Sequence, residues 1–383
     1  MRKFNVAVVG ASGMVGGEVL GLLETRRFPV GEFQPFNSGR KPASVVFRGK
    51  KYACAAPSLE ALKRADIAFF VSTDEVAEEF APRLAAAGTW CIDDSSRFRL
   101  APGVPLVIPE VNGAELKPAR KLIAGPNCTL TGAAVALAEI HRKFRVTELR
   151  LATYQAVSGA GKAAMGELEE ELKAYFKKGA VPREKGGKFP RPIAFNVFPQ
   201  VGDFDGEGDS GEENKVEAEL KNYFRKGAVE KTEGAKFPRP IAFNLFPQVG
   251  GFDGEGNSGE ENKVVAELKK IWGDKRIKIS CTAVRVPVLR GHSLAAWFKV
   301  ARPCSAGDVA KELKRTPGLK FFEKPEDYPT PLENGQRTEI VYAGRLRRAH
   351  TSANEFQLWI VSDNLYKGAA LNSVQIAERI ARL

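Results

Sequence analysis

The hydrophobic pattern at the start of the chain predicts a strand, a tight turn and a helix. An apolar run, "FNVAVV" from Phe4, is followed by glycine-rich "GASGMVGG" and then by apolar positions at helical spacing in "EVLGLLE". Further strand-like runs, "EFQPF", "ADIAFFVS" and "GTWCIDDSS", follow downstream. Such alternation of strands and helices is typical of a doubly wound α/β sheet.

The middle of the chain contains a direct repeat. Residues 171–218 align with residues 219–266 at 37 identical positions of 48. Repeat architectures need at least three copies to bury a continuous core, so two copies indicate a local duplication within a larger fold. Each copy predicts a strand, "PIAFNVF" or "PIAFNLF", then a loop and a helix. The helix starts fit capping boxes at Ser210–Glu213 and Ser258–Glu261.

Two predicted helices extend beyond the ends of the repeat, one downstream, which is the helix of the second copy, and one upstream. The downstream helix, over residues 260–272, should end at Gly273 in a left-handed conformation. Its apolar positions at helical spacing are Val264, Val265, Leu268, Ile271 and Trp272. The upstream helix, over residues 164–178, should end at Gly179, and its apolar positions are Met165, Leu168, Leu172, Tyr175 and Phe176.

Length and composition indicate a two-domain globular protein. The chain has 383 residues, 43% of them hydrophobic, and a formal net charge of +12. Lysine and arginine are dispersed and form no nucleic-acid-binding motif, so nucleic-acid binding is not expected, and acidic small molecules explain the charge as well. No apolar run is long enough to span a membrane and no signal peptide is recognisable, which predicts a cytoplasmic protein. Five scattered cysteines and three histidines favour neither disulfides nor a metal site.

The first glycine turn predicts a dinucleotide site. Gly10, Gly13 and Gly16 lie between a predicted strand and a predicted helix. Glycines there let a pyrophosphate approach the free N–H groups of a helix N-terminus. A merely tight turn is the alternative.

The next strand favours NADP over NAD. Instead of an acidic residue for a ribose 2′-hydroxyl, Ser38, Arg40 and Lys41 follow this strand. A hydroxyl and a guanidinium suit a 2′-phosphate. A solvated basic loop is the alternative.

One cysteine is a candidate nucleophile. Cys128 follows a Pro-Asn turn in "AGPNCTLTG" and directly precedes an amphipathic helix. A helix N-terminus favours a thiolate, as a nucleophile requires. A small buried core residue is the alternative for a lone cysteine.

Taken together, the motifs resemble aspartate-β-semialdehyde dehydrogenases. The resemblance runs from Phe4 to the C-terminus, apart from one additional 48-residue copy, and its segments occur in the family's order. They are "GASGMVG", "IDDSSRFRLAPGVPLVIPEVN", "GPNCT", "TYQAVSGAGK", "FPRPIAFN", "GEENK", "VRVPVLRGHS" and "WIVSDNLYKGAALNSVQIAE".

The resemblance implies NADPH-dependent reduction of β-aspartyl phosphate to aspartate semialdehyde, with release of phosphate, in lysine, threonine and methionine biosynthesis. Cys128 would form a thioester, His292 would act as acid and base, and Gln155 would orient the substrate. The implied substrate contacts are Arg285 to the α-carboxylate, Arg99 and Lys263 to the phosphate, together with Asn127 and Glu260. The expected cofactor contacts beyond those named above are Ser12, Met14, Val15, Ser72, Ser158, Gly159, and Asn364 near the nicotinamide.

Two departures and the duplication leave alternatives open. Asp94 and Gly125 each stand where the family commonly has asparagine, which affects loop geometry rather than a reacting group. Chain connectivity favours the second repeat copy, with Glu260 and Lys263, over Glu212 and Lys215 of the first. N-acetyl-γ-glutamyl-phosphate reductase, whose cysteine usually lies in a "PGCY"-like stretch, is the rival enzyme, and an inert interaction protein is the rival of another class.

The predicted fold is α/β, with a Rossmann-type NADP-binding domain and a mixed α+β catalytic and dimerisation domain. The first would comprise residues 1–126 with 363–383, and the second residues 127–362. A homodimer or homotetramer is expected.

Overall fold

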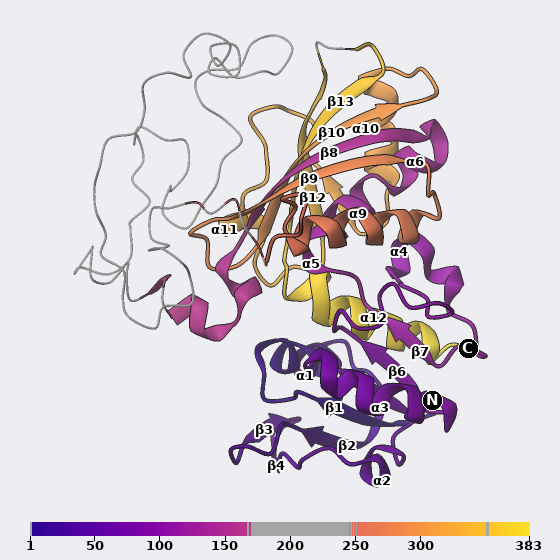
Figure 1. Ribbon diagram of the computed structural model, residues 1–383, viewed down its shortest axis with the longest axis vertical. Coiled ribbons are helices and arrows are strands. Elements are labelled where there is room, and N and C mark those ends of the chain that lie inside the picture. The colour runs from indigo at the N-terminus through magenta and orange to yellow at the C-terminus, as the bar shows by residue number, and fades with distance from the viewer. Residues whose placement is uncertain are drawn as a thin grey trace. The chain divides into compact units, whose positions relative to one another are not determined.

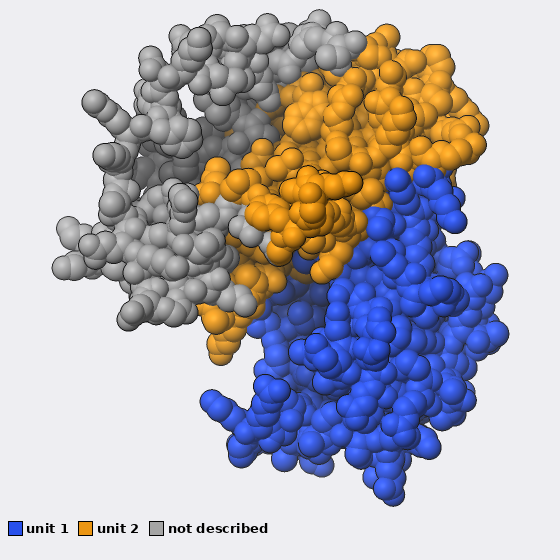
Figure 2. All heavy atoms as spheres, viewed as in Figure 1, with its two compact units in different colours: residues 1–135, 266–275, 365–383 blue, residues 136–265, 276–364 orange. Residues whose placement is uncertain are grey.

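The computed structural model describes residues 2–166, 168–169, 245, 247, 249, 251–349 and 352–383. The chain divides into two compact units, coloured blue and orange in Figure 2. Unit 1 comprises residues 1–135, 266–275 and 365–383, and unit 2 comprises residues 136–265 and 276–364. The first repeat copy, its predicted strand and helix, and most of the second copy lie outside the described residues.

Unit 1 contains a five-stranded parallel sheet in the order β2-β1-β5-β6-β7. The strands are β1 (Phe4–Val9), β2 (Val30–Phe36), β5 (Ile67–Phe70), β6 (Trp90–Asp93) and β7 (Leu122–Ala124). All four residues of β5 and all four of β6 are buried, as expected for parallel strands covered on both faces. The predicted α/β class and the first four predicted strands are therefore confirmed.

Several helices belong to this unit, and two of them share the core of the sheet. They are α1 (Met14–Thr25), α2 (Leu59–Leu62), α3 (Asp74–Ala86), α4 (Pro109–Asn112), α5 (Cys128–Ala136), whose last residue belongs to unit 2, and α12 (Leu371–Ile380). The C-terminal α12, yellow in Figure 1, contacts α1 and shares one apolar cluster with it and the sheet. A short hairpin, β3 (Ser44–Phe47) with β4 (Lys50–Ala53), and the turn η1 (Gly113–Glu115) complete this part.

Unit 2 is built on a six-stranded mixed sheet in the order β11-β12-β13-β10-β8-β9. The strands are β8 (Val146–Gln155), β9 (Lys278–Arg285), β10 (His292–Val300), β11 (Leu319–Phe321), β12 (Val341–Arg348) and β13 (Glu355–Ser362). The remaining elements of this unit are α6 (Ala138–Phe144), η2 (Val157–Ala160), α10 (Ala306–Arg315) and α11 (Pro331–Asn334). Strand β8 pairs in parallel with β9 and antiparallel with β10, so the sheet is mixed, and the predicted combination of helices and strands in this domain is confirmed.

The helix of the second repeat copy is α9 (Gly259–Trp272), which starts within the copy and continues beyond it. The predicted capping box is present, because Ser258 N–H donates to Glu261 Oε2 at 2.6 Å and Glu261 N–H donates to Ser258 Oγ at 3.4 Å. Gly273 follows with φ of +65°, as predicted for a left-handed C′ residue. This helix and both of its ends are therefore confirmed.

None of the helices in the described residues is long and apolar enough to cross a membrane. All five cysteines are free thiols. The described parts of the chain contain no group of three or more His, Cys, Asp or Glu side chains that could hold a metal ion.

Candidate functional site

The glycine turn after β1 is packed so tightly that two of its positions require glycine. Gly10 has φ of +94°, and a Cβ on it would lie 2.3 Å from the carbonyl oxygen of Val71. A Cβ on Gly16 would lie 2.2 Å from the carbonyl oxygen of Gly10. Helix α1 begins at Met14 immediately after this turn, so its free N–H groups can donate to a phosphate.

The other predicted cofactor residues of unit 1 also lie near the carboxyl ends of its strands. Ser38, Arg40 and Lys41 are exposed and follow β2, and Ser12 is exposed within the turn. Ser72 follows β5, and its buried hydroxyl has no hydrogen-bond partner in the described structure. Met14 and Val15 form the first turn of α1 and are half-buried. The carboxyl ends of parallel strands are where such sheets bind nucleotides.

Cys128 is the first residue of α5, as the sequence predicted. The side-chain oxygen of Asn127 accepts the N–H of Thr129 at 2.8 Å, which caps this helix. A Cβ on Gly368, in the π-helical turn η3 (Tyr366–Ala370), would lie 2.7 Å from Cβ of Cys128. Position 368 therefore requires glycine, and Cys128 is half-buried against it.

Arg99 lies beside the Cys128 loop and is only 9% exposed. Its Nε donates to the carbonyl oxygen of Gly125 at 3.0 Å, and its Nη2 donates to that of Asp94 at 2.9 Å. Its Nη1 donates to Glu267 Oε1 at 3.2 Å. The guanidinium thus contacts protein groups on three sides, which the sequence did not predict.

The two departures from the family pattern meet in the structure. A Cβ on Gly125 would lie 2.3 Å from Oδ1 of Asp94. The same oxygen accepts Ser373 Oγ–H at 2.6 Å, whereas Asp94 Oδ2 has no hydrogen-bond partner in the described structure. Burial raises the pKa of Asp94 to about 7, and Asp93 adds to this rise.

In unit 2, the ends of two strands bring predicted substrate residues together. Gln155 of β8 and Arg285 of β9 are register partners at the carboxyl ends of these parallel strands, and both are buried. A Cβ on Gly159 would lie 3.1 Å from Arg285 Nη1 and 3.4 Å from Cε1 of His292. The same end of these strands is therefore lined by Gln155, Gly159, Arg285 and His292.

His292 is fully buried and fixed by the backbone. Its Nδ1 accepts the N–H of Ala156 at 3.0 Å, and the carbonyl oxygen of Ala156 accepts Arg285 Nη1 at 2.5 Å. Burial lowers the pKa of His292 well below its ordinary value, and the charge of Arg285 lowers it further. The neutral ring accordingly carries its proton on Nε2.

The remaining predicted residues of unit 2 occupy two places. Asn364 Nδ2 donates to Ser158 Oγ at 3.0 Å, and Asn364 Oδ1 accepts the N–H of Gly291, the residue before His292, at 3.0 Å. Glu260 and Lys263 lie on the first turns of α9, where Glu260 is buried and Lys263 is exposed.

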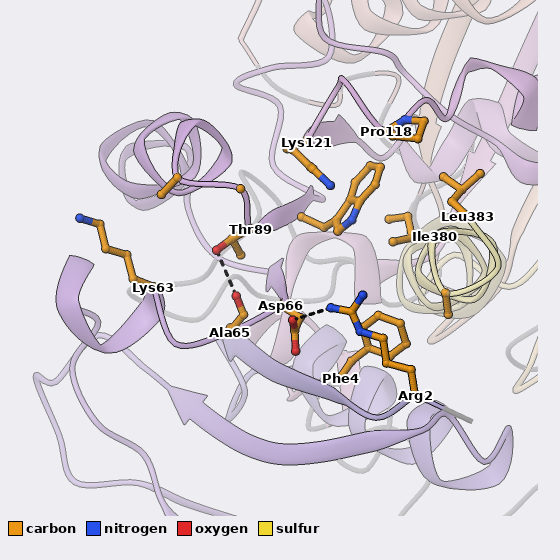
Figure 3. A pocket seen from close by; sticks show the side chains of 14 residues that line it. Arg2, Phe4, Lys63, Ala65, Asp66, Thr89, Pro118, Lys121, Ile380 and Leu383 are labelled. Carbon is orange, nitrogen blue, oxygen red and sulfur yellow. Dashed lines mark hydrogen bonds and ion pairs between the residues drawn. The ribbon is translucent and has the colours of Figure 1, made fainter.

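In unit 1, a pocket of about 530 Å³ opens at the amino ends of the strands of the parallel sheet (Figure 3). Phe4 and Trp90, which begin two strands, help to line it. Lys121 lies over the Trp90 ring at 3.9 Å, and Arg2 pairs with Asp66 at 3.2 Å. The pocket lies at the amino ends of the strands, so it is not where this type of sheet binds a dinucleotide.

Comparisons with known proteins agree with this geometry. Residues 5–119 match the family model of the semialdehyde dehydrogenase NAD binding domain, and residues 137–229 and 215–367 match that of the semialdehyde dehydrogenase dimerisation domain. Aspartate-semialdehyde dehydrogenase of Shewanella violacea is 37% identical over 384 residues, which cover 100% of this chain and 98% of that protein.

The chain belongs to the aspartate-semialdehyde dehydrogenase family. It is therefore an oxidoreductase of amino-acid biosynthesis with an NAD(P)-binding domain. The family membership that its motifs predicted is confirmed. The repeat lies where the match to the dimerisation domain is split into two overlapping ranges.

Solved members of the aspartate-semialdehyde dehydrogenase family share the fold. The Vibrio cholerae aspartate semialdehyde dehydrogenase II has a TM-score of 0.82 and 32% identity, covering 100% of this chain and 99% of that one. It has also been solved complexed with ASA. The Candida albicans enzyme, solved with NADP, has 19% identity, a TM-score of 0.66 and 98% coverage of both chains, and shows the same fold.

Sequence reasoning missed three residues around Cys128. Glu267 contacts Arg99, Gly368 packs on Cys128, and Ser373 holds Asp94. The short motif "NLYKGAALNS" carried the signal for Gly368 and Ser373, because a glycine and a serine flank a helix start there. Nothing in the sequence distinguishes Glu267 from other glutamates of the helix.

Proposed function

We propose that the chain catalyses reduction of β-aspartyl phosphate by NADPH, giving aspartate semialdehyde, NADP⁺ and inorganic phosphate. The observation that carries this proposal is the position of Cys128 at the first residue of α5, beside the buried Arg99, in a chain of this family. A helix N-terminus and a nearby guanidinium both favour a thiolate over a thiol.

The Cys128 thiolate is proposed to attack the acyl carbon of the substrate, so that an S–C bond forms and the C–O bond to phosphate breaks. NADPH, if held at the glycine turn of unit 1, would supply the hydride that reduces the thioester. The resulting oxyanion re-forms a carbonyl and expels the thiolate, which leaves aldehyde and the starting enzyme. No proton has to be gained or lost at the collapse.

His292 supports this sequence as a hydrogen-bond donor. Its Nδ1 is occupied by the N–H of Ala156, so the proton that a neutral ring can offer lies on Nε2. A donor aimed at a developing oxyanion stabilises it without a net proton transfer. The resemblance to the family predicted that His292 acts as both acid and base. The geometry supports the part of this role in which His292 donates a proton or a hydrogen bond.

The charged residues are proposed to hold the substrate at its two ends. Arg285 offers a planar guanidinium for the α-carboxylate, beside Gln155. Arg99 and Lys263 would bind the phosphate, and Asn127 and Glu260 complete the substrate site. Arg99 has N–H groups in addition to the three already used by Gly125, Asp94 and Glu267.

The glycine turn supports the fit of a dinucleotide, because the close packing that requires Gly10 and Gly16 brings the end of β1 and the N-terminus of α1 together, as in sites that bind a pyrophosphate. We propose NADP rather than NAD because Ser38, Arg40 and Lys41 are exposed after β2, where an acidic residue would otherwise bind a ribose. Ser12, Met14, Val15, Ser72, Ser158, Gly159 and Asn364 are proposed as further cofactor contacts.

We propose that the second repeat copy supplies the site and that the chain forms a homodimer or homotetramer. Lys270, which lies on α9 just beyond the end of this copy, donates to the carbonyl oxygens of Arg99, Ala101 and Val104 at 2.6, 3.3 and 2.9 Å. The equivalent position after the first copy is Asn222, which lacks that charge. The dimerisation-domain match supports the assembly.

The reverse reaction tests the proposal. Purified protein is mixed with aspartate semialdehyde, phosphate and either NADP or NAD, and reduced cofactor is followed by absorbance. We expect phosphate-dependent turnover with a preference for NADP. Turnover only with N-acetylglutamate semialdehyde would favour the rival reductase, and cofactor binding without any turnover would favour an inert interaction protein.

A further inference from the structure

Beside the Cys128 loop lies a buried carboxylate that none of the steps above uses. Glu267 of α9 is 1% exposed. Its Oε1 accepts Arg99 Nη1 at 3.2 Å, and its Oε2 accepts the backbone N–H of Asn127 at 2.7 Å. Both oxygens therefore accept from donors that belong to the proposed site.

Arg99 extends this contact to two loops. Arg99 donates to the carbonyl oxygens of Asp94 and Gly125. Asp94 directly follows β6, and Gly125 directly follows β7. Asn127, contacted by Glu267, caps α5 and precedes Cys128. One carboxylate and one guanidinium thus tie together the ends of two strands and the start of one helix.

The pair is also balanced in charge. Burial alone would lower the pKa of Arg99, but Glu267, Cys128 and Asp94 act in the other direction and its pKa is raised. A buried guanidinium without a counter-charge is strongly unfavourable. Glu267 therefore lets Arg99 remain charged and in one orientation beside the nucleophile.

We propose that Glu267 is a positioning residue for this site: its carboxylate fixes the guanidinium of Arg99 and the peptide N–H of Asn127 in one arrangement and so holds Cys128 and the phosphate-binding group in register. The proposal rests on the proposed function for the role of Arg99. Glu267 acts through these neighbours and does not itself touch the reacting atoms.

Glu267→Gln is the sharpest variant because it preserves shape. Glutamine has only one oxygen, so its NH₂ group must face a second donor, either Arg99 or the N–H of Asn127. Glu267→Asp keeps the charge but shortens the side chain by one methylene. Glu312→Gln is the matched control. Glu312, on helix α10, is also buried, and it pairs with Lys143 of α6 at 2.5 Å.

The experiment measures kcat and KM for phosphate and for NADP in the reverse reaction, per folded enzyme, with all three variants. A misplaced Arg99 should raise the KM for phosphate about tenfold and lower kcat about tenfold in Glu267→Gln, with the KM for NADP unchanged. Glu267→Asp should raise the KM for phosphate and lower kcat in the same way but to a smaller extent, again with the KM for NADP unchanged. Glu312→Gln should lower the melting temperature without these changes in KM and kcat.

A second readout does not depend on turnover. The rate at which iodoacetamide alkylates Cys128, followed by peptide mass spectrometry, should change at least about threefold in Glu267→Gln relative to Cys54 in the same molecules. Wild-type kinetic constants and an unchanged alkylation ratio in folded Glu267→Gln, or in Glu267→Asp if the first variant does not fold, would overturn the proposal. If wild-type protein shows no phosphate-dependent turnover, the proposed function fails, while the alkylation ratio still decides the role of Glu267.

Discussion

The backbone N–H of Ala156 donates to Nδ1 of His292 at 3.0 Å, and this bond decides which nitrogen of the ring carries a proton. The pKa of His292 lies well below its ordinary value because the ring is buried and Arg285 is close. The ring should therefore stay neutral from pH 6 to pH 8, with Nε2–H as its only donor.

Nuclear magnetic resonance can check this state. In a pH titration, the His292 ring signals, assigned with a His292→Asn variant, should stay constant between pH 6 and pH 8. Arg285→Gln removes the positive charge and should raise the pKa of His292. A wild-type titration midpoint near pH 6.5 would be incompatible with the buried neutral ring.

Asp94 predicts a pH-dependent loss of stability. Its pKa is about 7 in the folded protein against an ordinary 3.8, so the folded state retains a proton that the unfolded chain has lost between these values. The free energy of unfolding should therefore fall as pH rises from about 4 to about 7 and then level off.

Asp94→Asn should remove this penalty while keeping the acceptor for Ser373. At pH 8 the variant should be more stable than wild type by roughly 1 to 4 kcal/mol, and at pH 4 the two should coincide, as measured by urea unfolding. An equal gain at both pH values would show that ionisation is not the cause.

Gly125 and Asp94 should be energetically coupled. A Cβ at position 125 would collide with Asp94 Oδ1 at 2.3 Å, so Gly125→Ala should cost roughly 1 to 3 kcal/mol of unfolding free energy. Combined with Asp94→Ala, which vacates that space, the same change should cost markedly less. Strictly additive costs in this double-mutant cycle would mean that the two residues do not compete for space.

The two repeat copies can be distinguished through their lysines. If the second copy supplies the site, Lys263→Ala should lower kcat/KM by about tenfold or more, because a phosphate contact is lost. Lys215→Ala, at the equivalent position of the first copy, should leave kcat/KM within about twofold of wild type. A greater loss in Lys215→Ala would assign the site to the first copy.

The sequence predicted well what local chemistry determines. A buried strand, three glycines and an amphipathic helix must form a βα turn, and Gly10 indeed adopts positive φ there. A serine and a glutamate three residues apart capped α9, and a cysteine after Pro-Asn began α5. Each of these features depends on residues close together in the chain.

Contacts between distant segments could not be predicted in this way. Glu267 and Asn127 are 140 positions apart, and their contact depends on where α9 lies relative to the start of α5. Likewise, Asp94 and Gly125 looked like two independent departures until the parallel pairing of β6 and β7 brought them together. The buried positions of Arg99 and His292 also depend on tertiary packing rather than on their motifs.

The central claim is that Cys128 carries the acyl group, and intact-protein and peptide mass spectrometry test it most directly. Protein incubated with aspartate semialdehyde and NADP without phosphate should gain an aspartyl group on Cys128, which added phosphate should discharge. Cys128→Ala should bind NADP normally, acquire no acyl group and lose phosphate-dependent turnover by at least about a thousandfold. Turnover that persists in Cys128→Ala, or acylation of a different residue in wild type, would contradict the account.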